Sequence, residues 1–358
     1  MTEKALIAMS GGVDSSVAAL LTAREGFRCI GCTMRLYENA DAGIAADRGC
    51  CSLDDVEDAR SVARRLGMPF YVFDFTEEFR AEVIGPFVEC YRRALTPNPC
   101  IECNRTMKFA KLLRRAEELG CVRLVTGHYA RVEREGGRWL LKKALDDRKD
   151  QSYVLYMLTQ EQLEMVRFPL GGLTKPQVRA SAEENGFVNA AKPDSQDICF
   201  VPDGDYAAMI ERYTGQKTVP GHFVDRDGHI LGEHKGIEHY TVGQRRGLGL
   251  SFGEPMYVCA VRSEDNTVVL GPKEALFSSE VSVPSFHWIA GGPPAGQVRG
   301  KAKIRYRHRE ELVTAIPTPD GGAKLLFDEP QRAPTPGQAA VLYDGDTVLG
   351  GGTIGYTE

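Results

Sequence analysis

Two short motifs contain cysteines whose spacing suits redox, metal-binding or nucleophilic chemistry. Cys100 and Cys103 stand at C-x-x-C spacing in NPCIECN (98–104), and Cys199 stands alone in DSQDICF (194–200). A C-x-x-C pair is compatible with a redox couple, with half of a metal site, or with a nucleophile and its neighbour. A lone cysteine before a Phe-Val pair is more typical of a buried structural thiol. Nothing inside either motif decides among these roles.

A third motif, SGGVDSS (10–16), has the composition of a phosphate-binding loop. Gly11 and Gly12 permit a sharp turn and let backbone N–H groups approach an anion, and a helix starting near Ser15 directs its positive dipole end to the same place. The motif is not a Walker A loop, because no Gly-Lys-Ser/Thr follows, and it lacks the Gly-x-Gly-x-x-Gly pattern of dinucleotide sites. Asp14 is suited either to hold Mg²⁺ or to cap the helix.

The elements that must position these motifs alternate between strands and helices. The predicted strands cover 5–9, 28–34, 69–75 and 122–127, and the predicted helices include about 77–94 and 104–119. This alternation is typical of an α/β fold with a doubly wound parallel sheet, which gathers ligands at the carboxyl ends of its strands. Because SGGVDSS directly follows the first strand, we expect it at that edge.

The composition and pattern of the sequence change after residue 205. Residues 206–276 are rich in glycine and short strands, which predicts a small β-rich domain after an N-terminal catalytic domain over residues 1–205. Residues 277–358 repeat short strands separated by Gly/Pro turns, and this spacing is typical of a closed β-barrel. A length of 358 residues is consistent with three domains.

Composition narrows the class of protein. No apolar run approaches the roughly 18–20 residues of a membrane span, and the N-terminus lacks the pattern of a secretory signal, so we expect a cytoplasmic protein without a membrane partner. Ten cysteines are too sparse for a disulfide scaffold in a chain of this size, which favours free, catalytic or metal-bound thiols. Cys29 and Cys32 also have C-x-x-C spacing, but on a predicted strand they point to opposite faces.

One segment is strongly basic although the net charge is −5. In RGKAKIRYRHR (299–309) a cation occupies every second position. On a strand this spacing places the cations on one face, with Ala302, Ile304 and Tyr306 on the other. Such a strip predicts a surface that follows nucleic-acid phosphates, with a solvated outer face as the plainer alternative. The six cations are Arg299, Lys301, Lys303, Arg305, Arg307 and Arg309.

SGGVDSS resembles the signature of the PP-loop ATP pyrophosphatases, which cleave ATP between its α and β phosphates and commonly adenylate a carbonyl oxygen. NPCIECNR, TGHYAR, KDQSYVLY, DSQDICF and TVGQRRGLG then follow in the order found in the tRNA-specific 2-thiouridylases, which the chain resembles over essentially its full length. The resemblance implies that ATP, with Mg²⁺, adenylates C2 of the wobble uridine of tRNA. Sulfur then arrives from a persulfide supplied by a donor protein, and AMP and pyrophosphate leave.

The resemblance also implies roles for single residues. Cys103 matches the cysteine regarded as the nucleophile, Cys199 matches the one that receives persulfide sulfur, and the two are expected to close a transient disulfide. The positions that match nucleotide-binding residues are Ala8, Met9, Ser10, Gly11, Gly12, Val13, Asp14, Ser15, Met34 and Gly127. The positions that match the target-base segment are Asn98, Pro99 and Cys100, and those that match other tRNA contacts are His128, Lys149, Asp150, Gln151, Arg305, Tyr306 and Gln338.

The chain departs from the family pattern at Cys100, where many members have Asp. The extra thiol leaves two mechanisms open. One is the persulfide and disulfide route through Cys103 and Cys199. In the other, Cys100, Cys103 and Cys199 ligate a [4Fe–4S] cluster whose open iron binds hydrosulfide, whereas zinc would more often complete four protein ligands. The adjacent Cys50 and Cys51 would make an awkward chelate, and we expect free thiols in a loop.

Other functions remain open from the sequence. A PP-loop thiolase for another tRNA position would share the loop and the thiols, although the pairing of NPCIECN with DSQDICF disfavours it. A nucleotide-binding metal or redox regulator would use the thiols without releasing pyrophosphate. A small-molecule ligase of the PP-loop type would leave the basic segment without a role. A monomer that clamps one tRNA is the simplest assembly to expect.

Overall fold

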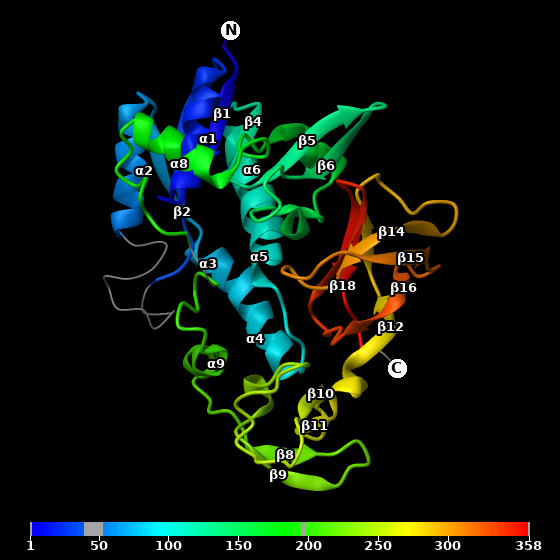
Figure 1. Cartoon of the computed structure of the whole chain (residues 1–358). Coiled ribbons are helices and arrows are strands. Elements are labelled where there is room, and N and C mark those ends of the chain that lie inside the picture. Colours follow the sequence, from blue (N-terminus) through cyan, green and yellow to red (C-terminus); the bar gives the residue numbers. More distant parts are fainter. Residues whose placement is uncertain (1, 39–52, 195–197, 357–358) are drawn as a thin grey trace.

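The computed structural model describes residues 2–38, 53–194 and 198–356 (Figure 1). Within these residues the N-terminal domain is built on a five-stranded parallel sheet in the order β3-β2-β1-β4-β7. The strands are β1 (Lys4–Ala8), β2 (Arg28–Arg35), β3 (Phe70–Asp74), β4 (Arg123–Val125) and β7 (Val166–Arg167). Successive strands are added first on one side of β1 and then on the other, so the topological switch point lies between β1 and β4.

Helices cover both faces of this sheet, which confirms the predicted doubly wound fold. They are α1 (Val13–Arg24), α2 (Leu53–Arg65), α3 (Thr76–Phe79), α4 (Gly85–Arg92), α5 (Pro99–Glu102), α6 (Leu112–Glu118), α7 (Gln160–Met165) and α8 (Lys175–Glu184). α1, α2 and α8 pack on one face through small residues such as Ala18 and Ala59. α3 to α6 pack on the other face through larger residues such as Phe79 and Phe87. No helix in the described ranges is long and apolar enough to cross a membrane.

The two long helices expected over about 77–94 and 104–119 are each interrupted by a π-helical stretch. η1 (Arg80–Ile84) separates α3 from α4, and η2 (Cys103–Lys111) separates α5 from α6. In a π-helix the backbone hydrogen bonds connect residues five apart, which changes the side chains that share a face. Such stretches are rare and frequently lie at functional sites.

A small sheet and a β-barrel follow the N-terminal domain, as the sequence patterns predicted. Helix α9 (Tyr206–Thr214) leads into the small sheet, which has the order β10-β11-β8-β9 and lies at the opposite end of the molecule from β1 (Figure 1). The strands of both parts are β8 (Gly221–Val224), β9 (Ile230–His234), β10 (Tyr257–Arg262), β11 (Thr267–Gly271), β12 (Phe277–Val283), β13 (Phe286–Trp288), β14 (Val298–Lys303), β15 (Glu311–Pro317), β16 (Ala323–Arg332), β17 (Ala339–Asp344) and β18 (Thr347–Thr353). The described residues also contain three single-turn 3₁₀-helices, η3 (Ser152–Leu155), η4 (Ile237–His239) and η5 (Lys273–Leu276).

The N-terminal domain and the barrel share a sheet and an apolar core. The hairpin of β5 (Ala130–Glu135) and β6 (Arg138–Lys143), which the sequence patterns did not reveal, extends the barrel sheet through the pairing of Thr347 with Lys142. Tyr343 of β17 is fully buried in the same apolar cluster as α4 and η2. The barrel is therefore packed against the domain that carries the motifs, and its loops reach the carboxyl edge of the parallel sheet.

Candidate active site

The SGGVDSS loop joins the end of β1 to the start of α1. The helix begins at Val13 with Gly12 as its N-cap, two residues earlier than predicted. Its first internal hydrogen bond runs from the Ser16 N–H to the Gly12 carbonyl oxygen (3.3 Å), so the N–H groups of the first turn are left for another acceptor. At the carboxyl edge of a parallel sheet, this geometry suits phosphate.

Two glycines let neighbouring segments approach the loop. Gly11 has φ +76°, and a Cβ there would lie 2.4 Å from the Asp55 carbonyl oxygen. A Cβ on Gly127, two residues after β4, would lie 2.8 Å from the Ser15 nitrogen. Both distances are too short for a side chain, so α2 and the segment after β4 contact the loop through their backbones.

A Gly127→Ala substitution is therefore expected to push the segment after β4 away from the phosphate loop. We expect the free energy of unfolding to fall by about 1–3 kcal/mol, as in other overpacked sites, and the affinity for ATP to fall by roughly 10-fold. Urea denaturation and calorimetric titration measure the two effects. Gly172→Ala is the matched control, because a Cβ there meets nothing within 4 Å. Unchanged ATP affinity in Gly127→Ala would contradict the view that this loop binds ATP and that Gly127 packs against it.

Asp14 does not cap helix α1, which corrects one of its two predicted roles. The helix has no side-chain cap, and the Asp14 carboxylate accepts hydrogen bonds from the Tyr129 hydroxyl (2.7 Å) and from Lys175 Nζ (2.8 Å). Lys175 also forms an ion pair with Asp194 at 2.7 Å. One largely buried cation therefore connects the phosphate loop to the start of DSQDICF.

Asp194 is the centre of this ion-pair network. Its carboxylate also contacts Lys149 at 2.6 Å and Arg179 at 3.1 Å. Burial acts to raise the pKa of Asp194, but the hydrogen bonds from Lys149 and Lys175 outweigh it, so the pKa lies below its ordinary value. The carboxylate is ionised at neutral pH and fixes the segment that leads toward the third thiol.

A cavity of about 380 Å³ brings the phosphate loop and three thiols together. Residues from β1, β2, α5, η2 and the segment after β4 line it. The predicted site residues among its walls are Ala8, Met9, Ser10, Asp14, Ser15, Met34, Pro99, Cys100, Cys103, Gly127, His128, Gln151 and Cys199. The walls of this cavity therefore place the phosphate loop next to three thiols.

Cys100 and Cys103 lie in the first turn of the helix formed by α5 and η2. This helix begins at Pro99 rather than near 104, because Asn98 accepts a hydrogen bond from the Cys100 N–H (3.2 Å) and Pro99 occupies the first helical position. Residues three apart lie on the same side of a helix, and both cysteines line the cavity. Cys100 is exposed and Cys103 is buried.

Cys199 reaches the cavity from a different segment. The Tyr37 hydroxyl donates a hydrogen bond to the Cys199 carbonyl oxygen (2.7 Å), and the neighbouring Phe200 packs edge-to-face on Phe79 with 5.7 Å between ring centroids. These contacts hold the backbone beside the thiol. Residues 195–197 of the same motif lie outside the described residues.

The three cavity thiols are also the predicted ligands of the alternative cluster. Cys100, Cys103 and Cys199 line the same space, which fits the donor set of a [4Fe–4S] centre. Within the described residues their sulfur atoms do not form a group in which all lie within 4.8 Å of one another, as the ligands of a single zinc ion would. Cys50 and Cys51 lie outside the described ranges.

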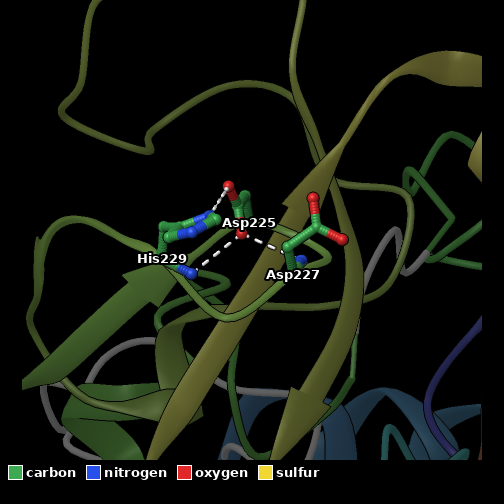
Figure 2. Close-up of side chains that lie close together, drawn as sticks. All are labelled: Asp225, Asp227 and His229. Carbon is green, nitrogen blue, oxygen red and sulfur yellow. Dashed lines mark hydrogen bonds and ion pairs between the residues drawn. The ribbon is translucent and has the colours of Figure 1, made fainter.

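A separate group of potential ligand atoms lies in the turn between β8 and β9. Figure 2 shows the Asp225 carboxylate accepting hydrogen bonds from the backbone N–H groups of Asp227 and His229 (2.9 Å each) and facing the His229 ring. These bonds stabilise a tight turn, and Asp227 and His229 are exposed. The turn lies at the end of the molecule opposite β1 (Figure 1), so it is not part of the active site.

A larger cavity of about 700 Å³ adjoins the first and shares Ser10, Asp14 and Gln151 with it. Tyr306 and Arg307 of the barrel line it together with the phosphate loop. Its cationic side chains are Arg148, Lys149, Lys192, Lys303 and Arg307. Five carboxylates, those of Asp14, Asp55, Asp147, Asp150 and Asp194, line the same cavity. Arg148 and Arg307 are the exposed cations among its walls, and exposed arginines suit contact with phosphates.

Two residues predicted to contact tRNA shape the loop after β6. Asp150 is buried, and its carboxylate accepts hydrogen bonds from the N–H groups of Ala144 (3.0 Å) and Ser152 (3.2 Å). The Gln151 side chain accepts one from the Tyr129 N–H (3.0 Å). These hydrogen bonds fix the conformation of the loop. Asp150 also lines the larger cavity, and Gln151 lines both cavities.

His128 is buried at the wall of the smaller cavity. Its Nδ1 lies 2.7 Å from Thr126 Oγ1, and its Nε2 lies 3.5 Å from Lys108 Nζ. Burial, and then the charge of Lys108, hold the pKa of His128 well below its ordinary value. The imidazole is therefore neutral at physiological pH and does not act as a cation toward phosphates.

Arg305 and Gln338 hold the barrel in place. Arg305 Nη2 donates to the carbonyl oxygens of Val242 and Ala333 (3.0 Å each). Gln338 Nε2 donates to the carbonyl oxygen of Thr96 (2.8 Å), just before NPCIECN. Both residues therefore position the barrel and the helix that carries two thiols, and their direct contact with tRNA stays a prediction.

The strip of six cations predicted over 299–309 does not exist as one strand face. β14 ends at Lys303 and the chain then turns, so Arg305, Arg307 and Arg309 lie beyond the strand. Arg299 forms an ion pair with Asp328. Alternation in the sequence was compatible with a longer strand, but it does not reveal where a strand ends. Arg307 reaches the larger cavity from the turn.

Sequence reasoning missed Lys108, Tyr129 and Lys175. Lys175 is the first residue of α8, after Thr174, in a capping box that is visible in the sequence as Thr-Lys-Pro-Gln. That signal locates a helix start but not its neighbour, because the contact with Asp14 joins residues 161 positions apart.

Comparison with known proteins covers almost the whole chain. Residues 3–203 match the tRNA methyl transferase HUP domain, residues 207–272 the tRNA methyl transferase PRC-barrel domain, and residues 278–354 the aminomethyltransferase beta-barrel domain. These descriptions mention methyl transfer, whereas the full-length relatives are named for thiolation.

Two curated relatives are similar to this chain from end to end. The chain is 48% identical over 355 residues to tRNA-specific 2-thiouridylase MnmA of Acetivibrio thermocellus, covering 98% of this chain and 99% of that protein. It is 47% identical over 356 residues to the protein of the same name from Clostridioides difficile, covering 99% and 98%. A solved 4-thiouridine synthetase–RNA complex with bound ATP covers 56% of this chain and 45% of that chain at 22% identity, with a TM-score of 0.37, too low to support an argument. The chain belongs to the tRNA-specific 2-thiouridylase family.

Proposed function

We propose that the protein replaces the C2 oxygen of the wobble uridine of tRNA by sulfur in an ATP-dependent reaction. The observation that carries this proposal is the single cavity lined by the phosphate loop and by Cys100, Cys103 and Cys199. Membership of the 2-thiouridylase family supports the same substrate class. Methyl transfer would require neither the phosphate loop nor the thiols.

In the first step the C2 carbonyl oxygen attacks the α-phosphorus of ATP. The bond from that phosphorus to the bridging oxygen breaks, and pyrophosphate leaves with the electron pair. The phosphate loop supplies backbone N–H groups to the phosphates. Asp14 lines both cavities and is the carboxylate suited to hold the Mg²⁺ that accompanies the nucleotide. Adenylation converts the C2 oxygen into part of a good leaving group.

In the second step the terminal sulfur of a persulfide on Cys199 attacks C2. AMP leaves with the electron pair of the bond between C2 and oxygen. The Cys103 thiolate then attacks the Cys199 sulfur, which leaves the transferred sulfur on C2 and joins the two cysteines as a disulfide. A thiol reductant restores both cysteines, and a donor protein that carries a persulfide reloads Cys199.

The third thiol keeps a second form of sulfur delivery open. Cys100, Cys103 and Cys199 would be the residues that hold a [4Fe–4S] cluster, which when bound supplies an open iron for hydrosulfide. In either form the same cavity would hold the sulfur next to the adenylated base, and the modified nucleoside is the same. The persulfide form consumes two electrons from a thiol reductant, whereas hydrosulfide needs none.

We infer that tRNA phosphates approach through the larger cavity. It adjoins the thiol cavity, and two exposed arginines, Arg148 beside the KDQ loop and Arg307 on the barrel, line it from two domains. Cations on both sides of the target would anchor an anticodon loop whose base is turned out of its stack.

Replacing Arg148 and Arg307 together by alanine is expected to weaken tRNA binding. The slope of log K against log salt should decrease by about 1 for each phosphate that the protein no longer neutralises. Fluorescence anisotropy at several salt concentrations measures both quantities. Arg299→Ala is the control, since Arg299 is paired with Asp328 on the barrel surface and lines neither cavity. A double variant with the wild-type affinity and salt slope contradicts this route.

The proposed function is tested by incubating the protein with ATP, Mg²⁺, a persulfide donor and an unmodified tRNA transcript. Digestion and mass spectrometry should detect one 2-thiouridine for each AMP released. A transcript with cytidine at the wobble position is the matched control and should remain unmodified. Thiolation of that control would indicate another tRNA position. No thiolated nucleoside, either with persulfide or after anaerobic cluster reconstitution, would contradict the proposal.

A further inference from the structure

Lys108 is a cation in the thiol cavity that none of the motifs identified. Among the described residues that line this cavity, the charged side chains are Asp14 and Lys108. Asp14 already has a cationic partner outside the cavity wall, because Lys175 contacts both of its carboxylate oxygens at 2.8 Å. Lys108 is therefore the cation that this wall offers to a bound molecule.

The π-helical stretch η2 explains how Lys108 shares a face with Cys103. In an α-helix, residues five apart are rotated by about 140°, so they point to different sides. In a π-helix the hydrogen bonds run between residues five apart, as in the bond from the Leu112 N–H to the Met107 carbonyl oxygen. With this wider turn, Cys103 and Lys108 both line the cavity. Regular α-helical winding would direct the ammonium away from it.

His128 orients Lys108 without neutralising its charge. The imidazole is neutral, so with Thr126 at Nδ1 (2.7 Å), Nε2 is the nitrogen that accepts from the Lys108 ammonium at 3.5 Å. The His128 ring is held between Phe109 and Phe168, with centroid distances of 5.9 and 5.7 Å. A neutral, fixed acceptor thus steadies the ammonium and leaves its positive charge for an anion.

Lys111, on the same π-helical stretch, differs from Lys108 in having an acidic partner among the described residues. Lys111 forms an ion pair with Glu82 at 2.8 Å. Within the described residues Lys108 has no acidic partner of this kind, and a half-buried ammonium facing apolar walls is unfavourable unless an anion joins it.

The position of Lys108 indicates which anion this is. His128 directly follows Gly127, and Gly127 packs against the Ser15 nitrogen at the start of α1. The ammonium therefore lies near the switch point of the sheet, between the phosphate loop, where pyrophosphate is expected, and the thiols, where the base is expected. The group that must lie between pyrophosphate and base is the α-phosphate.

We propose that Lys108 binds the α-phosphoryl group of the nucleotide. This assignment rests on the proposed function for its place in the reaction. In adenylation the ammonium would offset negative charge on the α-phosphoryl oxygens as pyrophosphate departs. In sulfur transfer it would stabilise AMP as AMP leaves with the electron pair of the bond to C2. No proton transfer by Lys108 is required in either step.

The test compares AMP with adenosine, which differ by the α-phosphate alone. Calorimetric titration of the full chain with each ligand needs neither tRNA nor sulfur, so it remains informative even if the thiolation assay fails. We expect Lys108→Met to weaken AMP binding by about 10- to 100-fold, the range for a charge-assisted hydrogen bond. Adenosine binding should stay within about 3-fold of wild type.

Two further variants make the comparison specific. Lys108→Arg keeps the charge and should retain most of the AMP affinity, and Lys111→Met removes a nearby lysine and should leave both affinities unchanged. The proposal is overturned if Lys108→Met binds AMP as tightly as the wild type. It is equally overturned if AMP and adenosine lose affinity in the same proportion, because the effect then reflects cavity shape and not the phosphate.

Discussion

A Cys103→Ser variant is expected to bind ATP with normal affinity and to form no 2-thiouridine, with a loss of roughly 10³-fold or more in single-turnover rate. Serine has nearly the same size as cysteine, so the buried position in the first turn of η2 remains filled. Its hydroxyl is a far weaker nucleophile toward sulfur than a thiolate, so the transferred sulfur is not released. Mass spectrometry of digested tRNA and a nucleotide titration measure the two properties.

Other cysteine variants separate chemistry from packing. Cys259→Ser in β10 changes a half-buried thiol that lines neither cavity, and thiolation should persist. Cys100→Ser distinguishes the two forms of sulfur delivery. Thiolation that survives this change, without loss of any iron chromophore, excludes the three-thiol cluster. Substantial thiolation by Cys103→Ser would remove that residue from the mechanism.

Lys175→Met is expected to have the largest effect on stability. The Lys175 side chain is 10% exposed and contacts Asp14 at 2.8 Å and Asp194 at 2.7 Å. Removing a buried cation while leaving its carboxylates in place typically costs about 3–5 kcal/mol. We expect a loss of this size in the free energy of unfolding, measured by urea denaturation, together with loss of ATP-dependent activity. Lys217→Met is the control, because its ion-paired side chain is 87% exposed.

The pH dependence of the same variant is a second readout. In the wild type the pKa of Asp194 is lowered, so its ionised form contributes stability above the ordinary carboxyl range, and this contribution is lost as pH falls through the lowered pKa. Without Lys175 that pKa should rise, and acid unfolding should begin at a higher pH. A Lys175→Met protein within about 1 kcal/mol of the wild type, with the same acid transition, would contradict the bridging role.

The sheet and the phosphate loop were predictable because their signals are local. SGGVDSS follows the first strand, and Gly11 has the positive φ that only glycine readily adopts. Cys29 and Cys32 lie in the apolar clusters on opposite faces of the sheet, as strand alternation predicts. Burial raises the pKa of Cys29 to about 11, which makes it a packing residue and not half of a redox pair.

The features that were not predictable depend on contacts between distant segments. Nothing near Lys175 in the sequence indicates Asp14, and nothing in the pattern of the β5–β6 hairpin indicates that it extends the sheet of the C-terminal barrel. The spacing of Arg305 fits a surface strand, yet β14 ends at Lys303 and the guanidinium donates hydrogen bonds to the carbonyl oxygens of two distant segments. The π-helical winding that brings Lys108 beside the thiols cannot be predicted from the hydrophobic pattern.

The central claim is that ATP activates the uridine by adenylating its C2 oxygen, and oxygen labelling tests it most directly. A tRNA transcribed with uridine labelled with ¹⁸O at C2 is converted in a single turnover with unlabelled ATP, and the products are analysed by mass spectrometry. We predict that the label appears in the phosphate of AMP, in an amount equal to the 2-thiouridine formed. Label in water with unlabelled AMP, or ADP and phosphate as products, would contradict the mechanism.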